Sequence, residues 1–589
     1  MKKTKVFLVS VSSSFYDWLP YTSGCLISHA QSESYIRENF EFLEPEYRYK
    51  CLDFKDFHEK LKTSDIIGLS NWIWNQSYND KISKIFKKYN KSGVVIYGGV
   101  NVPEDKDLAF KYANERPYVD LFFCGPGEEN FKNFLLNYSE KEIDEFEGTF
   151  TKTSYQYSKK QYQNLLIPTP YTDGIFDNIL KNTKSKLGAV IETNRGCPYS
   201  CSFCDWGGMT KSKILKSSSL DVFNTISYVV SQENIDKVDL ADANFGFFSE
   251  DVDYIKHFID KKKLRRSNIN LLMGGFAKNG SKYIEEIMEL IYFNFNSYYN
   301  NNAIKISFQS HDLQTLKTID RNNIDNSKLY PMIERFQNKG IDIVAEIIIG
   351  LPGDTFDGWI ETIQKNVDLK VLSQRTYILH VMVNTPLYEP NYKEKYKIKT
   401  KKILIPEDLN KKTIDEYHNS RIKKKVIETN CNFNNNTEYE TLEFVYECFS
   451  FDSTELMKIF DVWFWFNTFY NSNIARKEIQ NDPRTVREQF DNFINLVNQN
   501  EIPFIKSLLD EYRSIVWNTI VKPEPVTLIK DLLQVNFLNK FYLRGNELVD
   551  IYLNKEIALK ELQKLYKNIT FDHFKKQDLK NLYTMSSEV

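Results

Sequence analysis

The first 140 residues alternate short apolar runs with amphipathic stretches, and this alternation predicts their fold. The runs read as buried strands and occupy residues 6–11, 65–70, 94–97 and 121–124. Between the second run and the third, Ile82, Ile85, Phe86 and Tyr89 recur at helical spacing. Strands that alternate with helices predict an α/β fold with a doubly wound (Rossmann-like) parallel sheet, in which ligands bind at the carboxyl ends of the strands.

The same alternation returns in the middle of the chain. Its strands are predicted at residues 189–193, 238–240, 269–273, 304–308, 343–349 and 376–383. Six parallel strands with intervening helices predict an open, partial (β/α)6 barrel rather than a closed barrel of eight strands. In barrels of this kind the reactive groups lie at the carboxyl ends of the strands.

Helical periodicity dominates the last third of the chain. Helices are predicted at residues 454–470, 504–520, 526–536 and 547–566. One more helix carries Phe490, Phe493 and Val497 on one face, and Asp482-Pro483 reads as its cap. A helical domain at this place would cover the barrel mouth and shape access for a substrate.

These patterns divide the 589 residues into four segments, as expected for a chain too long to form a single core. They are a Rossmann-like domain at 1–150, a proline-bearing linker at 151–184, the barrel at 185–400, and a helical substrate or capping domain at 401–589.

Composition changes this picture little, because 42% hydrophobic and 26% charged residues are ordinary for a globular protein. The formal net charge of −2 provides no general attraction to nucleic acid or to an anionic membrane, so we expect neither as a partner. No apolar run approaches the length that spans a bilayer, and residues 6–11 are too few for a signal peptide. We therefore expect a cytoplasmic protein.

Three cysteines in one short segment carry the clearest chemistry. Cys197, Cys201 and Cys204 have the spacing Cys-x3-Cys-x2-Cys, and three thiolates leave one iron of a [4Fe–4S] cluster without a protein ligand. A structural zinc site would require a fourth ligand, and no histidine lies near this segment. A disulfide framework would require an oxidising compartment, and the chain has only eight cysteines. The spacing therefore favours an iron–sulfur cluster.

The cysteine segment resembles the signature of the radical S-adenosylmethionine (radical SAM) enzymes, including the aromatic Phe203 before the third cysteine. In that family the open iron chelates S-adenosylmethionine. Polar residues after the later barrel strands match the order of the family's S-adenosylmethionine contacts. With Phe203, the resemblance implies such contacts from Asp242, Asn244, Gln309, Ser310, Arg321, Glu346 and Asn384.

The loops of the first domain resemble the cobalamin-binding domain that precedes the barrel in one large subclass of these enzymes. That subclass often has Trp-Asn after the third strand, Gly-Gly after the fourth and Gly-x-Gly-Glu after the fifth. The resemblance implies cobalamin contacts from Ser70, Trp72, Trp74, Asn75, Gly98, Gly99, Gly125, Gly127 and Glu128. The Asp-x-His-x-x-Gly motif that supplies a cobalt ligand in other cobalamin proteins is absent. Trp72 or Trp74 could cover the lower face of the corrin, or either could pack in the core.

The resemblance implies a cobalamin-dependent radical SAM methyltransferase. Such an enzyme methylates an unactivated carbon of a peptide or small molecule through a 5′-deoxyadenosyl radical and methylcobalamin. It would receive electrons from a donor such as flavodoxin or ferredoxin.

Three alternatives remain open at this point. The first is a cobalamin-dependent cyclase or rearrangement enzyme without methyl transfer. The second is a nucleic-acid methylthiotransferase, which would hold a second cluster on Cys25, Cys51 and Cys124. The third is a binding module without catalysis.

Overall fold

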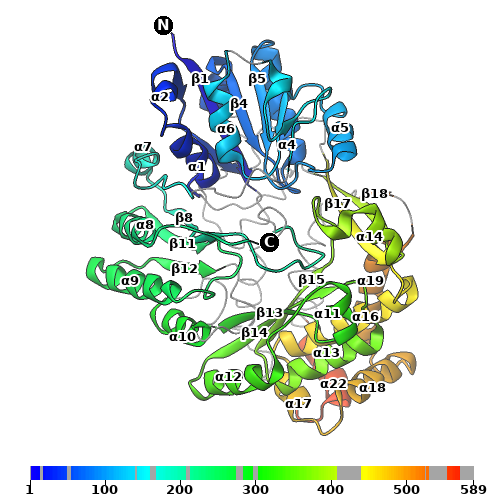
Figure 1. The fold of residues 1–589 in the computed structure, drawn as a ribbon. Coiled ribbons are helices and arrows are strands. Elements are labelled where there is room, and N and C mark those ends of the chain that lie inside the picture. Colours follow the sequence, from blue (N-terminus) through cyan, green and yellow to red (C-terminus); the bar gives the residue numbers. More distant parts are fainter. Residues whose placement is uncertain are drawn as a thin grey trace.

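A computed structural model describes the parts of the chain that carry the predicted elements. The described residues are 2–12, 18–49, 55–139, 142–158, 167–206, 213–273, 283–295, 303–406, 439–523, 526–528 and 554–570. They form a mixed α/β structure with a largely parallel N-terminal sheet, two parallel sheets in the middle of the chain and a group of C-terminal helices (Figure 1).

The N-terminal sheet contains all four predicted strands. These are β1 (Thr4–Ser12), β4 (Ile66–Ser70), β5 (Val94–Gly98) and β6 (Leu121–Phe123), which are parallel and adjacent in this order. Three short strands extend the sheet, namely β2 (Phe40–Phe42) and β3 (Glu46–Tyr49), which are parallel to β1, and β7 (Thr149–Phe150), which is antiparallel to β6.

Helices cover both faces of this sheet because side chains of β1 alternate between two apolar clusters. Phe7 and Val9 pack with helices α3 (Lys55–Thr63), α4 (Gln76–Tyr89) and α5 (Lys106–Asn114). Val6 and Leu8 pack on the opposite face with helices α1 (Tyr21–Ala30) and α6 (Gly127–Leu136). The carboxyl ends of β4, β5 and β6 therefore open on the same edge, toward the middle of the molecule (Figure 1).

The six strands predicted for the middle of the chain are also present, in two three-stranded parallel sheets. The first sheet has the order β12 (Asn270–Met273), β11 (Ile235–Leu240), β8 (Leu187–Ile191). The second has the order β13 (Ala303–Gln309), β14 (Asp342–Ile349), β15 (Ser373–Ile378). The sixth strand ends at Ile378, five residues before the predicted end, and beyond it the Val381 amide donates to the Glu443 carbonyl of another sheet at 2.7 Å.

Helices α8 (Ser219–Ser231), α9 (Glu250–Arg265) and α10 (Ile284–Asn294) pack against the first middle sheet and share its apolar core. The core of the second middle sheet is larger. It joins helices α12 (Asn326–Asn338) and α13 (Phe356–Asp368) to helices of the C-terminal part, and it includes the fully buried Trp465. The C-terminal helices are thus fixed to the second middle sheet by a shared core.

A small unpredicted sheet joins two strands before the first C-terminal helices to one strand after them. Strand β16 (Lys399–Pro406) pairs antiparallel with β17 (Tyr439–Glu447) and parallel with β18 (Val526–Leu528). The predicted helix at 526–536 is therefore wrong at its start, where the chain forms β18. Residues 529–536 lie outside the described part. The lysines of β16 hide the alternation of apolar and polar residues that would predict a strand. One of them, Lys401, is nevertheless fully buried, as is its partner Phe444 on β17.

Two of the predicted C-terminal helices occur where expected, and each ends in a π-helical turn. They are α16 (Ser453–Phe466) with η3 (Asn467–Asn471), and α19 (Pro503–Val516) with η4 (Trp517–Val521). The helix predicted at 547–566 is described as α22 (Lys555–Leu565), and residues 547–553 lie outside the described part. In the described ranges, no helix combines the length and the apolarity that a bilayer crossing requires.

The predicted cap Asp482-Pro483 is wrong. Helix α18 (Val486–Asn498) begins three residues later, where the Thr485 side chain accepts from the Glu488 amide and the Glu488 carboxylate accepts from the Thr485 amide. This reciprocal pair is a capping box, and it satisfies the backbone amides of both Thr485 and Glu488. Asp482 instead ends the preceding helix α17 (Arg476–Asn481).

Candidate cofactor site

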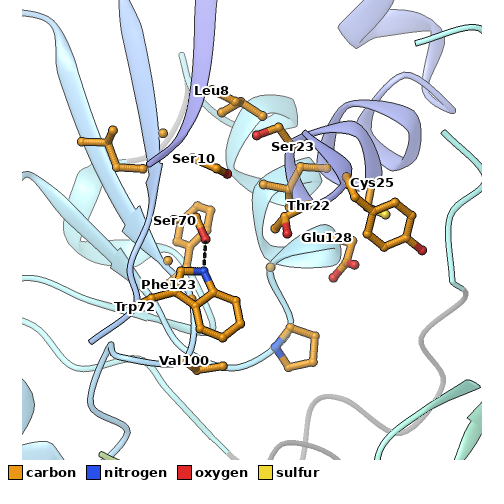
Figure 2. A pocket seen from close by; sticks show the side chains of 18 of the residues that line it. Leu8, Ser10, Thr22, Ser23, Cys25, Ser70, Trp72, Val100, Phe123 and Glu128 are labelled. Atoms are coloured by element: carbon orange, nitrogen blue, oxygen red, sulfur yellow. Dashed lines mark hydrogen bonds between the residues drawn. The ribbon is translucent and has the colours of Figure 1, made fainter. Parts of the chain in front are cut away.

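A cavity of about 570 Å³ lies between the carboxyl edge of the N-terminal sheet and the first middle sheet. Seven of the nine residues predicted to contact cobalamin line it. They are Ser70, Trp72, Gly98, Gly99, Gly125, Gly127 and Glu128. Figure 2 shows Ser70, Trp72 and Glu128 around this space, with Thr22 and Ser23 of α1 on another side.

The cavity has a mainly apolar wall and a wall with several charged or polar side chains. Leu8, Phe123 and Phe131 provide apolar surface from the sheet and from α6. The opposite wall comes from the middle of the chain. Its members are Val190, Glu192, Arg195, Asp205, Asp239, Ala241 and Asn384.

Gly99, the residue after β5, is required by a close approach of two loops. The Asn71 amide donates to the Gly98 carbonyl at 2.6 Å, and the Asn101 amide donates to the Asn71 carbonyl at 3.2 Å. Gly99 has φ +103°, and a Cβ atom added there would lie 2.6 Å from the Asn71 carbonyl oxygen. A side chain at this position is excluded, so bare backbone faces the cavity.

The two tryptophans after β4 have different environments. Their rings stack at a centroid distance of 4.9 Å and an interplanar angle of 13°. Trp72 lines the cavity and its Nε1 donates to Ser70 Oγ at 3.2 Å, whereas Trp74 is 37% exposed and does not line it (Figure 2 shows Trp72 and Ser70). The structure thus presents Trp72 to the cavity and places Trp74 behind it.

Asn75 supports this loop and does not line the cavity. Its side chain is fully buried, accepts from the Trp72 amide at 2.8 Å and donates to the Val11 and Ser70 carbonyls at 2.9 and 3.0 Å. These three bonds fix the backbone that carries Trp72.

The cysteine segment lies beside the same cavity, since Arg195 before it and Asp205 after it are both lining residues. Cys197 and Cys201 are buried and Cys204 is half-buried. Two backbone hydrogen bonds connect the segment to later parts of the middle region. The Ser202 amide donates to the Ile319 carbonyl at 3.0 Å, and the Ser202 carbonyl accepts from Leu387 at 2.9 Å.

Among the described residues, no three Cys, His, Asp or Glu side chains converge closely enough to hold a single metal ion. The thiolates of a [4Fe–4S] cluster bind different irons, so they stand further apart than the ligands of one ion and require no such convergence.

Two predicted residues donate toward the cysteine sulfurs. Asn244 Nδ2 lies 2.9 Å from Cys197 Sγ, and Arg321 Nη1 lies 3.9 Å from Cys201 Sγ. The Arg321 guanidinium is buried and also donates to the carbonyls of Ser307 and Phe308, near the end of strand β13. Both donors are thus positioned to stabilise negative charge on the thiolates.

Asn244 Oδ1 and Gln309 Oε1 are buried acceptors to which no described group donates. Gln309 also adopts a left-handed backbone, φ +65°, at the end of β13. Buried acceptors normally have hydrogen-bond donors, so these two oxygens, one of them on the residue that contacts Cys197, fit a ligand that brings N–H or O–H donors.

The other predicted S-adenosylmethionine contacts have protein partners. Asp242 is fully buried, and its carboxylate accepts from the amides of Thr193 and Asn194 at 2.8 and 3.1 Å. Burial raises the pKa of Asp242 to about 8, although these hydrogen bonds oppose the shift. Ser310 Oγ accepts from the Asp312 amide at 3.1 Å, Glu346 accepts from the Ser307 hydroxyl, and Phe203 packs on the second middle core.

Asn384 lies against the N-terminal domain. Its Oδ1 accepts from the Glu104 amide at 2.8 Å, and its Nδ2 donates to the carbonyls of Val102 and Val100 at 2.9 and 3.2 Å. Asn384 was predicted to contact S-adenosylmethionine, and this contact between domains was not predicted.

A buried ion cluster also escaped the sequence analysis. Arg195 pairs with Glu192 at 2.7 Å and with Glu128 at 2.8 Å. Burial alone would lower the pKa of the Arg195 guanidinium, but the two carboxylates raise it, so the group stays charged. The position of Arg195, two residues before Cys197, was the available signal.

The cysteines of the methylthiotransferase alternative are only partly described. Cys25 lines the cavity from α1, and Cys124 is buried at the end of β6 with its Sγ 3.6 Å from the Pro103 carbonyl. Cys51 lies outside the described residues, so the structure does not test that alternative.

No known family profile matches the chain. Over 410 residues it is 26% identical to the cobalamin-dependent radical SAM methyltransferase TokK of Streptomyces tokunonensis, covering 67% of this chain and 58% of that protein. It is 24% identical, with the same coverage, to the 2-(S-pantetheinyl)-carbapenam-3-carboxylate methyltransferase of Streptantibioticus cattleyicolor. The chain thus spans less than two thirds of the length of these relatives.

The fold resembles that of a solved cobalamin-dependent S-adenosylmethionine radical enzyme, OxsB, with aqua-cobalamin and S-adenosylmethionine bound. The TM-score is 0.51 at 12% identity, over 100% of this chain and 84% of that one. The comparisons confirm the resemblance to the cobalamin-dependent radical SAM class. The named sequence relatives within that class are methyltransferases.

Proposed function

We propose that this chain is a cobalamin-dependent radical SAM enzyme that methylates an unactivated carbon of a small molecule or peptide. One observation carries the proposal. A single cavity is bordered by three glycine-bearing or tryptophan-bearing loops of a parallel sheet and by both flanks of a three-cysteine segment. A cofactor in the cavity and a cluster on the cysteines would therefore act on the same space.

The residues present fit the three groups. Cys197, Cys201 and Cys204 would hold the [4Fe–4S] cluster, with Asn244 and Arg321 donating toward its sulfurs. The orphan acceptors of Asn244 and Gln309 would receive donors of S-adenosylmethionine, and Ser310, Glu346, Asp242 and Phe203 would support that site.

Cobalamin would lie on the edge of the N-terminal sheet. Gly98, Gly99, Gly125 and Gly127 present backbone without side chains, so a bulky ring system approaches them closely. Trp72 supplies the aromatic surface, since Trp74 and Asn75 stand behind it.

When bound, the cluster supplies an electron, S-adenosylmethionine the hydrogen-abstracting adenosyl group, and cobalamin the methyl group. The chain's own contribution is placement. Apolar side chains such as Leu8 and Phe123 exclude water from the cavity, and the buried Arg195 cluster fixes the cysteine segment against α6.

The proposal keeps the predicted organisation. It comprises a doubly wound cobalamin domain at 1–150, a linker at 151–184, a partial (β/α)6 barrel at 185–400 and a mainly helical substrate domain at 401–589. The enzyme would work in the cytoplasm, where thiolates stay reduced, with a flavodoxin or ferredoxin as electron donor.

Product analysis tests the reaction class. The protein is reconstituted anaerobically with iron, sulfide and hydroxocobalamin, and incubated with a reductant, methyl-labelled S-adenosylmethionine and extract of its own cells. Methyl transfer predicts 5′-deoxyadenosine, S-adenosylhomocysteine and a labelled product, all absent with Cys204→Ala. Formation of 5′-deoxyadenosine without S-adenosylhomocysteine would instead indicate a cyclase or rearrangement enzyme.

A further inference from the structure

Three loops leave the carboxyl ends of β4, β5 and β6 and border the cavity. Each loop, or the first turn of the helix that follows it, forms a hydrogen bond or an ion pair with a residue from another part of the chain. The loop after β6 meets Arg195 of strand β9 (Asn194–Arg195), whose Nη1 lies 2.8 Å from Glu128 Oε1. The loop after β5 meets Asn384, which follows β15. The loop after β4 meets Glu440 of β17 through the first turn of α4.

The contact of Glu440 is a helix cap supplied from a distant segment. Its Oε1 accepts from the Ser77 amide at 2.8 Å and from the Ser77 hydroxyl at 2.7 Å, and the Glu440 side chain is buried, at 4% exposure. The first amides of a helix have no partner within the helix, and a carboxylate there is favoured by the helix dipole. The local residue Asn75 does not cap the helix, because its side chain holds the Trp72 loop.

The contact of Asn384 is equally specific. One amide side chain saturates three backbone groups of the loop between Val100 and Glu104, and its own backbone is left-handed, at φ +68°. Asparagine is one of the few residues that tolerates this conformation. An aspartate would keep the bond to the Glu104 amide but would oppose two carbonyl oxygens with a negative charge.

We propose that Glu440 and Asn384 are positioning residues that set the corrin-facing loops of the N-terminal domain from outside that domain. Together with Arg195 they fix the spacing between the three loops and the cysteine segment. The inference rests on the proposed function, since the loops are positioned for a cobalamin. It means that the N-terminal sheet alone does not define its cofactor site, and that the small C-terminal sheet takes part in building it.

The test uses the full chain and hydroxocobalamin, with affinity read from the visible spectrum and cluster content from iron and sulfide. Glu440→Ala and Asn384→Ala each remove two or three hydrogen bonds, and we expect each to weaken cobalamin binding about tenfold with iron content unchanged. Glu440→Gln keeps the Oε1 acceptor but loses the charge, and we expect its affinity to lie closer to wild type than that of Glu440→Ala. Asn384→Asp is not expected to restore wild-type affinity.

Asn473→Ala is the matched control, because Asn473 is exposed and has a similar left-handed backbone, at φ +69°. Wild-type affinity in both alanine variants would overturn the inference. Equal loss of iron and cobalamin in those variants would overturn it as well, since it would indicate general damage to the fold. If the wild-type chain itself binds no hydroxocobalamin, the proposed function fails, and that result is separate from either outcome in the variants.

Discussion

Replacing Gly99 by alanine should disturb the cofactor loop far more than an ordinary glycine substitution. The added Cβ would lie 2.6 Å from the carbonyl oxygen and 2.9 Å from the amide nitrogen of Asn71. Both are backbone atoms, so no rotation of a side chain relieves the overlap. Gly340 offers a matched control, because its φ is also positive, at +73°, but an added Cβ meets nothing within 4 Å.

The magnitude follows from separating two effects. Placing a residue other than glycine in the left-handed region costs about 1–2 kcal/mol, and both variants bear this cost. Overpacking against fixed atoms adds about 1–3 kcal/mol, and only Gly99→Ala bears it. We therefore expect Gly99→Ala to be about 2 kcal/mol more destabilising to its loop than Gly340→Ala is to its own.

A chain with several apolar cores does not unfold in one step, so the effect should be measured locally. Hydrogen exchange of residues 98–102 reports the opening of the loop, and 2 kcal/mol corresponds to about 30-fold faster exchange. Affinity for hydroxocobalamin should fall in the same variant. Equal local effects of Gly99→Ala and Gly340→Ala would refute the reasoning, because the backbone contact would then carry no energy.

Further predictions concern the cysteine segment and the aromatic loop. Asn244→Ala removes a donor to Cys197 and should lower the midpoint potential of the cluster in an EPR-monitored titration, whereas an unchanged potential would contradict the contact. Trp72→Ala should alter the visible spectrum of bound cobalamin more than Trp74→Ala does, and a larger change with Trp74→Ala would reverse the assignment. Because burial raises the pKa of Asp242 to about 8, its neutral form is favoured in the fold, and its contribution to the stability of the apo chain should fall as the pH rises from about 4 to 8. Asp242→Asn should flatten that dependence when local stability is read from hydrogen exchange of the Thr193 and Asn194 amides, and an identical pH profile in the variant would contradict the shift.

The sequence was most informative where pattern and local geometry agree. The four long strands of the N-terminal sheet and all six in the middle region follow from apolar runs, because each packs side chains into an apolar core. The three short strands β2, β3 and β7 were not predicted. The small C-terminal sheet was missed because β16 is rich in lysine, and one of these, Lys401, is buried by tertiary contacts that no local pattern reveals.

In the candidate site, too, local motifs were predictable and contacts between distant segments were not. The motifs identified seven residues that line the cavity, since glycines and a tryptophan at strand ends are local signals. Contacts between distant segments were not predictable. Glu440 lies 363 positions from its partner Ser77, and Asn384 lies more than 280 from Val100 and Val102. Asn384 was predicted as an S-adenosylmethionine contact; it lines the cavity, and its side chain also bonds the loop between Val100 and Glu104.

The account depends on a cluster and a corrin in one chain, and elemental analysis tests this most directly. Iron, sulfide and cobalt are measured in anaerobically reconstituted protein and in the variant that replaces Cys197, Cys201 and Cys204 by alanine. The account predicts about four irons and one cobalt per wild-type chain, with iron lost and cobalt retained in the variant. About eight irons without cobalt would contradict it and would indicate the two clusters of a methylthiotransferase.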